Sequence, residues 1–150
     1  MSSVIIRPFN PNSDSGFIYS SYPKGAYYGA HDTSESVPPL KDRDNAKIKA
    51  QWFKAFYQQV QQQLISSTVL IACISDEPNT VLGYAILSGT TLEWVYVKEL
   101  FRNQGIAKLL VKNQQVETYR NITKVGFAIL SKHKEEGEKP HVRTAAKVES

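Results

Sequence analysis

Hydrophobic side chains recur every three to four residues along the stretch from Asn45 to Ile65. The apolar positions of this stretch are Trp52, Phe53, Phe56, Tyr57, Val60 and Leu64. Glutamines occupy many of the positions between them, so one face is aromatic and apolar and the other is polar. Because this spacing matches the turn of an α-helix, the pattern predicts an amphipathic helix that packs on a sheet.

The pattern changes after this helix to short runs rich in β-branched and aromatic residues. Three such runs are Thr68–Ser75, Val81–Ser88 and Thr91–Val97. The turn-forming residues Asp-Glu-Pro-Asn and Ser-Gly separate them, which predicts an antiparallel meander of three strands. A further short strand is expected over residues 4–9, where Pro8 removes a ladder donor and ends it.

The stretch between the first strand and the long helix begins with an Asn-Ser-Asp cap signal. This signal predicts a first helix over residues 12–22. Residues 23–41 contain several glycines and prolines and predict a long loop.

After the meander, a short helix is predicted for residues 105–112. The chain that follows this helix has two interpretations. In the first, residues 116–122 form a strand and residues 123–134 a helix. In the second, the helix runs on to residue 119 and residues 124–130 form the strand. Helical spacing of the apolar residues between 125 and 130 favours the first interpretation.

Composition narrows the class of protein. The 150 residues, 41% of them hydrophobic, suit one globular domain. No apolar run approaches the ~18 residues that span a bilayer, and no secretory signal is expected, so the prediction is a cytoplasmic protein with no membrane partner. The net charge of +4 is spread along the chain and mixed with acids, which makes nucleic acid an unlikely partner. The three histidines lack ligand spacing, so no metal is expected.

The most informative motif is Arg102-Asn103-Gln104-Gly105-Ile106-Ala107, which follows the meander and opens the short helix. Main-chain N–H groups at a helix start favour anions, and a glycine lets the main chain approach a ligand closely. The motif and the hairpin before it resemble the GNAT superfamily of acyl-CoA-dependent N-acyltransferases. The signature of that superfamily is Gln or Arg, two residues, Gly, one residue, then Gly or Ala. Arg102, Gly105 and Ala107 match it.

The resemblance implies a fold and a reaction. The expected fold is α/β, a mixed and mainly antiparallel twisted sheet flanked by helices, with the element order β-α-α-β-β-β-α-β-α. The expected activity is that of an N-acetyltransferase: acetyl-CoA is the co-substrate, and a primary amine attacks it directly in a ternary complex.

The resemblance also implies the cofactor-binding residues. The phosphates would be bound by Arg102, Asn103, Gln104, Gly105, Ile106 and Ala107. A bulge in the preceding strand would open a cleft for the pantetheine arm along the main chain of Tyr96, Val97 and Lys98. Asn121 corresponds to an asparagine that often ends the next strand in the family.

The candidate catalytic residues are Glu93 and Tyr119. Amine acylation requires a proton acceptor, and Glu93 is the lone acid in TTLEWVYV. Alternation predicts that its side chain shares a face with that of Val97, although a solvent-facing carboxylate is the alternative. The helix expected after residue 122 contains no tyrosine to protonate the leaving thiolate, so Tyr119 is the candidate acid, with Tyr22, Tyr27, Tyr28 and Tyr84 as other possibilities.

The chain is short after Lys134, where family members add two more strands. We expect a domain over residues 1–134 and a polar tail over 135–150, a short form similar to small phage-encoded acetyltransferases. An uncovered sheet edge favours a homodimer.

The acceptor is not identified by the sequence, and both small amines and proteins remain open. Its site is expected to be lined by residues 19–31, the start of the long helix and Glu93. The alternative function is a catalytically weak or inactive GNAT-fold protein that acts by binding a macromolecular partner.

Overall fold

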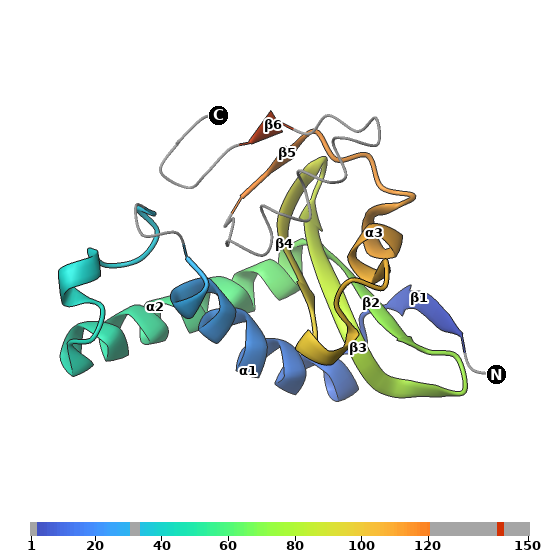
Figure 1. The fold of residues 1–150 in the computed structure, drawn as a ribbon, viewed down its shortest axis with the longest axis horizontal. Helices are drawn as coiled ribbons and strands as arrows, with labels where there is room; N and C mark the ends of the chain where they lie inside the picture. Colours follow the sequence, from blue (N-terminus) through green and yellow to red (C-terminus); the bar gives the residue numbers. More distant parts are fainter. Residues whose placement is uncertain (1–2, 31–33, 121–140, 143–150) are drawn as a thin grey trace.

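A computed structural model describes residues 3–30, 34–120 and 141–142 of this chain (Figure 1). The helices are α1 (Pro11–Tyr28), α2 (Ala46–Ser66) and α3 (Ile106–Val111), with short 3-10 turns at Leu40–Asp42 and Glu99–Phe101. The strands are β1 (Val4–Pro8), β2 (Thr68–Ile74), β3 (Glu77–Ser88), β4 (Thr91–Val97), β5 (Thr118–Tyr119) and β6 (His141–Val142).

The strands form one sheet in the order β1-β2-β3-β4-β5-β6. β1 to β4 pair antiparallel, whereas β5 joins β4 in parallel and β6 joins β5 in parallel. The mixed, mainly antiparallel sheet confirms the predicted fold class. The short β6 lies within the segment predicted as the polar tail.

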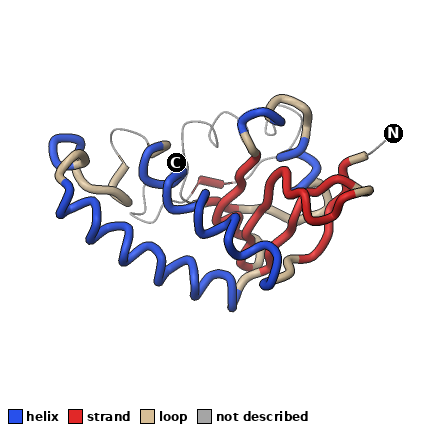
Figure 2. Tube along the Cα trace, turned by 90° about the horizontal axis from the view of Figure 1, so that it is seen from below, coloured by secondary structure: helices blue, strands red, loops and turns tan. Residues whose placement is uncertain are grey.

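Helices cover both faces of the sheet. α1 and α2 lie side by side on one face, and α3 lies on the other (Figures 1 and 2). The α1/α2 side holds a core of aromatic and aliphatic side chains that includes Tyr22, Phe56, Tyr84 and Trp94. The α3 side holds a second core of mostly aliphatic side chains, and Val97 and Tyr119 belong to it. Within the described part of the chain no helix is long and apolar enough to cross a membrane.

The long amphipathic helix is confirmed. Asn45 is its N-cap, and its side chain accepts hydrogen bonds from the N–H groups of Lys47 and Ile48. Phe56 and Val60 are buried against the sheet, and Trp52 stacks on Phe56 with ring centroids 4.6 Å apart. The aromatic stripe is therefore core, as its spacing predicts.

The first helix is longer than predicted, because residues 23–28 are helical and not loop. Pro23 removes a main-chain donor, which costs about 3 kcal/mol inside a helix. The side chains around it are buried, and the Tyr27 ring packs on Trp52 and Phe53 at centroid distances of 4.8 and 5.2 Å. Burial of each large side chain stabilises by about 1.5–3 kcal/mol, so packing outweighs the proline.

Two further boundaries differ from the prediction. β3 begins at Glu77, so most of the expected Asp-Glu-Pro-Asn turn is strand and the β2–β3 connection is short. α3 ends at Val111 and β5 follows at Thr118, so the interpretation in which the helix reaches residue 119 is wrong. The helix predicted for residues 123–134 lies outside the described residues.

A buried chain of hydrogen bonds joins α1 to β3 and β4. The Ser21 hydroxyl donates to the Phe17 carbonyl (2.7 Å), so the Tyr84 hydroxyl donates to Ser21 Oγ (2.8 Å). The Trp94 indole N–H donates in turn to the Tyr84 oxygen (3.2 Å). Burial raises the pKa of Tyr84, and these bonds oppose that shift only in part. Tyr84 is therefore a structural residue of the core.

Candidate functional site

β4 carries a bulge at Glu93. Leu87 of β3 pairs with Leu92 and its neighbour Ile86 pairs with Trp94, so Glu93 is the extra residue. Leu92 packs in the core on the α3 side, whereas Trp94 packs on the α1/α2 side. The family-implied bulge is thus present, and it reverses the alternation of side chains along β4.

β4 and β5 diverge at the same place. They pair at Thr91 with Thr118 and at Leu92 with Tyr119, and the Arg120 N–H donates to the Leu92 carbonyl at 2.9 Å. β4 then continues to Val97, beyond the last of these contacts. Among the described residues, the edge of β4 beyond Leu92 is therefore not covered by β5, as a splayed pair of strands requires.

The register shows which main-chain groups line this edge. The Lys98 N–H donates to the Leu82 carbonyl of β3, and antiparallel pairs alternate, so Tyr96 and Lys98 are bonded into the β3–β4 ladder. The N–H and C=O groups of Val95 and Val97 point away from β3. Of Tyr96, Val97 and Lys98, the three residues predicted to bind the pantetheine arm, only Val97 points its main-chain N–H and C=O groups away from β3. Val95, which was not among them, does so as well.

Gly83 allows β3 and β4 to approach closely at this end. A Cβ atom at Gly83 would lie 2.5 Å from the Tyr96 carbonyl oxygen and 3.1 Å from the Val97 Cα. Real Cβ atoms do not approach so closely, so any side chain at this position would push β4 outward. Gly83 thereby holds the end of β4 in its position next to the motif loop.

The motif loop connects β4 to α3 through two residues with left-handed backbone. Asn103 has φ +65° and Gly105 has φ +82°, and both side-chain positions are exposed. A Cβ atom at Gly105 would meet nothing within 4 Å, so the glycine satisfies the backbone angle and leaves the space above it open. Ile106 and Ala107 then bury their side chains against the sheet while their N–H groups open the first turn of α3.

Arg102 ties this loop to β4. Its Nε donates to the Val97 carbonyl oxygen at 2.8 Å, and its guanidinium lies 5.6 Å from the centre of the Tyr96 ring. Gln104 is exposed, with its amide nitrogen 3.5 Å from the Leu100 carbonyl. The predicted phosphate-binding residues from Arg102 to Ala107 are therefore contiguous around one loop beside the outward edge of β4.

Glu93 lies where the two strands diverge. It is buried, with 6% of its surface exposed, and its Oε1 is 4.0 Å from Nη1 of Arg120. Tyr119 faces the α3 side, so alternation predicts that the next side chain, Arg120, faces the α1/α2 side. The Glu93 carboxylate lies near the Arg120 guanidinium and therefore faces the α1/α2 side as well. Val97 faces the α3 side, so the prediction that Glu93 and Val97 share a face is wrong. The bulge is the reason.

Tyr119 is buried in the α3-side core, and this burial raises the pKa of its hydroxyl. The candidate base and the candidate acid consequently lie on opposite faces of the sheet. Tyr22 and Tyr27 are also core residues, and Tyr28 is exposed at the end of α1. Asn121 and His31 lie outside the described residues.

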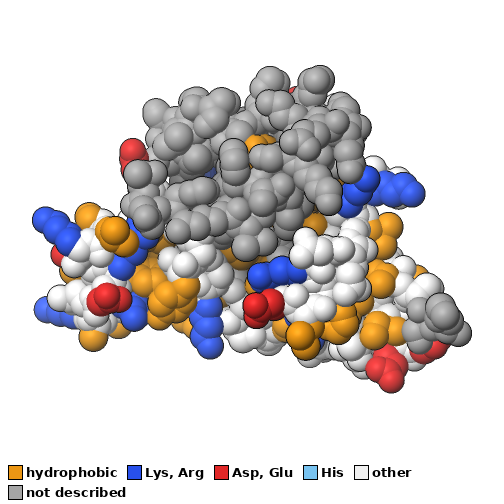
Figure 3. Space-filling view, viewed as in Figure 1, with side chains coloured by type: hydrophobic (Ala, Val, Ile, Leu, Met, Phe, Trp, Pro, Cys, Tyr) orange, Lys and Arg blue, Asp and Glu red, His pale blue; other side chains and the backbone are white. Residues whose placement is uncertain are grey.

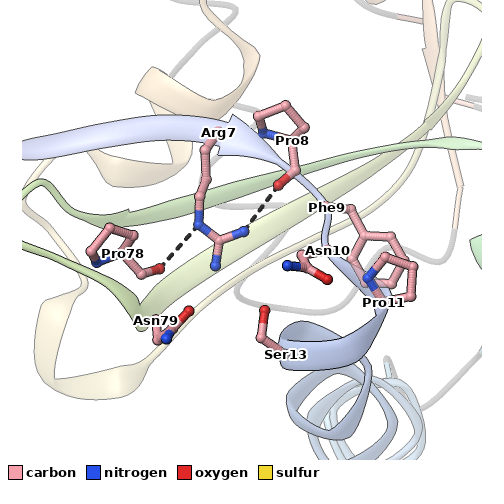
Figure 4. Close-up of a pocket in the computed structure, with 8 residues that line it drawn as sticks. All are labelled: Arg7, Pro8, Phe9, Asn10, Pro11, Ser13, Pro78 and Asn79. Atoms are coloured by element: carbon pink, nitrogen blue, oxygen red, sulfur yellow. Dashed lines mark hydrogen bonds between the residues drawn. The ribbon is translucent and has the colours of Figure 1, made fainter.

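A cavity of about 450 Å³ lies between β1, the start of α1 and the start of β3 (Figure 4). Arg7 crosses it, donating to the carbonyl oxygens of Pro78 (3.0 Å) and Pro8 (2.9 Å). The same guanidinium forms two 2.8 Å bonds with the buried Asp14 carboxylate, which also accepts from the Asn10 N–H (2.7 Å). Burial works to raise the pKa of Asp14, but these bonds outweigh it and hold the pKa below its usual value.

This cavity shares no residue with the predicted site, and the Arg7 that lines it joins β1 to α1 through Asp14. Within the described ranges no cluster of His, Cys, Asp or Glu could hold a metal ion. On the face drawn in Figure 3, basic side chains gather around the beginning of α2, and acidic side chains lie among them. Lys41, Asp44 and Lys47 are exposed in this region, so its surface is of mixed sign.

Comparisons with known proteins agree with this geometry at the level of fold. No protein-family model matches the chain, and a search of curated proteins found no match. The crystal structure of a GCN5-related N-acetyltransferase from Rhodopseudomonas palustris is similar with a TM-score of 0.50 and 15% identity, covering 98% of this chain and 76% of that chain. A candidate acetyl transferase from Pyrococcus furiosus is similar with a TM-score of 0.54 and 12% identity, covering 91% and 93%. The chain therefore has the GNAT fold.

Proposed function

We propose that this chain is an acetyl-CoA-dependent N-acetyltransferase that acts on a primary amine in a ternary complex. The observation that carries the proposal is the divergence of β4 from β5 at the Glu93 bulge, on the strand that leads to the Arg102–Ala107 loop. This combination suits an extended arm that lies along the main-chain edge of β4 and an anion that is bound by the loop after it. The names of the two similar structures support the same class of reaction.

The residues fit acetyl-CoA in two respects. The outward N–H and C=O groups of Val95 and the N–H of Val97 suit the amides of a pantetheine arm, as an added strand would use them. The open space above Gly105 and the first-turn N–H groups of α3 suit phosphate oxygens. When bound, acetyl-CoA supplies a thioester whose C–S bond breaks as the amine forms a C–N bond.

Glu93 is the proposed proton acceptor. An amine must lose a proton to act as a nucleophile, and a carboxylate at the point of divergence can take it. Tyr119 has no proposed part in this reaction, because it is buried on the other face of the sheet. A thiolate is a fair leaving group, so solvent can supply its proton.

The test is release of free CoA thiol from acetyl-CoA in the presence of a panel of amines. We expect Glu93→Gln to lower kcat by about 10²-fold or more while leaving acetyl-CoA affinity within about twofold. The exposed Glu117→Gln serves as the matched control, with full activity expected. Binding of acetyl-CoA with no turnover on any amine would instead favour the alternative, a GNAT-fold protein that acts by binding a partner.

A further inference from the structure

Arg120 stands beside the proposed base, and its role is not explained by the fold alone. The two side chains differ in exposure to solvent, since the Glu93 side chain is 8% exposed and the Arg120 side chain is 42% exposed. One member therefore lies inside the protein and the other faces solvent at the same point of the sheet.

The backbone of Arg120 is held firmly at this point. Its N–H donates to the Leu92 carbonyl at 2.9 Å. Two residues earlier, the hydroxyls of Thr118 and Thr91 are hydrogen-bonded at 2.7 Å, which fixes the start of β5 against β4. The strand ladder thus fixes the backbone of Arg120 next to the bulge that carries Glu93.

The pair is more open than a structural ion pair of the same chain. Arg7 and Asp14 meet through two bonds of 2.8 Å, and the Arg7 side chain is only 17% exposed. Glu93 and Arg120 approach only to 4.0 Å, which is beyond the 2.7–2.9 Å of a charge-assisted hydrogen bond. Part of the Arg120 side chain therefore stays exposed to solvent beside the buried Glu93 carboxylate, and a guanidinium has five N–H donors with which it can bind a second anion.

This arrangement has a consequence for the acceptor, on the basis of the proposed function. An amine that presents its nitrogen to Glu93 brings its neighbouring substituent toward Arg120. A carboxylate there forms a charge-assisted pair with the guanidinium, whereas a second ammonium group is repelled. We propose that the acceptor is a free α-amino acid, whose amine faces Glu93 and whose carboxylate is bound by Arg120.

The experiment compares L-amino acids with their α-carboxamides, using the full chain and acetyl-CoA. The two members of each pair share the side chain and the α-amine, and only the free acid carries a negatively charged carboxylate. We expect kcat/KM to favour the free acid by about tenfold or more, with the difference mainly in KM. Arg120→Gln brings the ratio to about one, and Arg120→Lys keeps part of the preference. Lys54→Gln removes a positive charge from the exposed surface of α2 and leaves the ratio unchanged.

Binding of the amino acids is measured in parallel by calorimetry, with and without CoA, so the inference does not depend on turnover. Amino acid binding that Arg120→Gln weakens about tenfold supports it. Equal use of acids and carboxamides, a ratio that survives Arg120→Gln, or absence of both amino acid turnover and binding overturns it. Loss of the proposed function is distinguishable, because it appears as failure to bind acetyl-CoA or to acetylate any amine.

Discussion

The guanidinium of Arg102 donates from Nε to the carbonyl oxygen of Val97 at 2.8 Å, which ties the motif loop to the last residue of β4. The register points this carbonyl away from β3, toward the edge that the proposed pantetheine arm would follow. Arg102 therefore sets the distance between the main-chain edge and the loop. In the sequence it was identified only as a charge for a phosphate.

Replacement of Arg102 by alanine is expected to weaken acetyl-CoA binding by about tenfold or more, because both a positive charge and the tie to Val97 are lost. Calorimetric titration measures this change. The control is Lys112→Ala, which removes an exposed positive charge at the end of α3. Equal affinities for the two variants would show that only overall charge matters.

Removal of the Tyr84 hydroxyl tests the buried hydrogen-bond chain. Tyr84→Phe leaves the Trp94 indole N–H without its acceptor, so we expect the free energy of unfolding to fall by about 1–3 kcal/mol. Urea denaturation measures it. Tyr57→Phe is the matched control, because Tyr57 is 41% exposed and its hydroxyl loss should change stability by less than about 0.5 kcal/mol. A similar effect in both variants would contradict the structural role of Tyr84.

The Arg7–Asp14 pair predicts a pH dependence of stability. The folded pKa of Asp14 is below its usual value of 3.8, so the stabilisation is present above that value and is lost as the pH falls through the folded pKa. Denaturant titrations of wild type and Asp14→Asn from about pH 6 to about pH 2 should therefore differ most at the higher pH. A difference that stays constant into the acid range would rule out Asp14 as the source.

Local pattern was sufficient for much of the fold. The long helix could be predicted from the spacing of Trp52, Phe56 and Val60, because this periodicity can be recognised without knowing which distant residues the stripe packs against. β4 was predicted with its observed bounds for the same reason. The length of α1 was missed because Pro23 signals a break, while the contacts of Tyr27 with α2 that outweigh it come from residues far along the chain.

The site was predicted less completely than the fold. The motif located the loop, and Glu93 was found as the lone acid of its strand. The position of the bulge depends on how β4 pairs with β3, and no residue of TTLEWVYV signals it. This single inserted residue decides that Val95 faces the outward edge, and that Glu93 and Val97 face opposite sides. Arg120 was not identified, because its nearness to Glu93 arises only when β5 pairs with β4.

Two glycines of this chain allow a matched test of the proposal that the loop at Gly105 binds acetyl-CoA. Gly105 and Gly89 both have positive φ, +82° and +61°, and a Cβ atom at either would meet nothing within 4 Å. Gly105→Glu and Gly89→Glu should therefore each lose about 1–2 kcal/mol of stability through backbone strain, with the domain still folded.

The decisive measurement is calorimetric titration of wild type and these two variants with acetyl-CoA. We predict a Kd on the order of micromolar for wild type and for Gly89→Glu, and no detectable binding for Gly105→Glu, because the new side chain and its charge would occupy the proposed phosphate position. Unchanged affinity in Gly105→Glu, or no binding by the wild-type chain, would contradict acetyl-CoA binding at this loop.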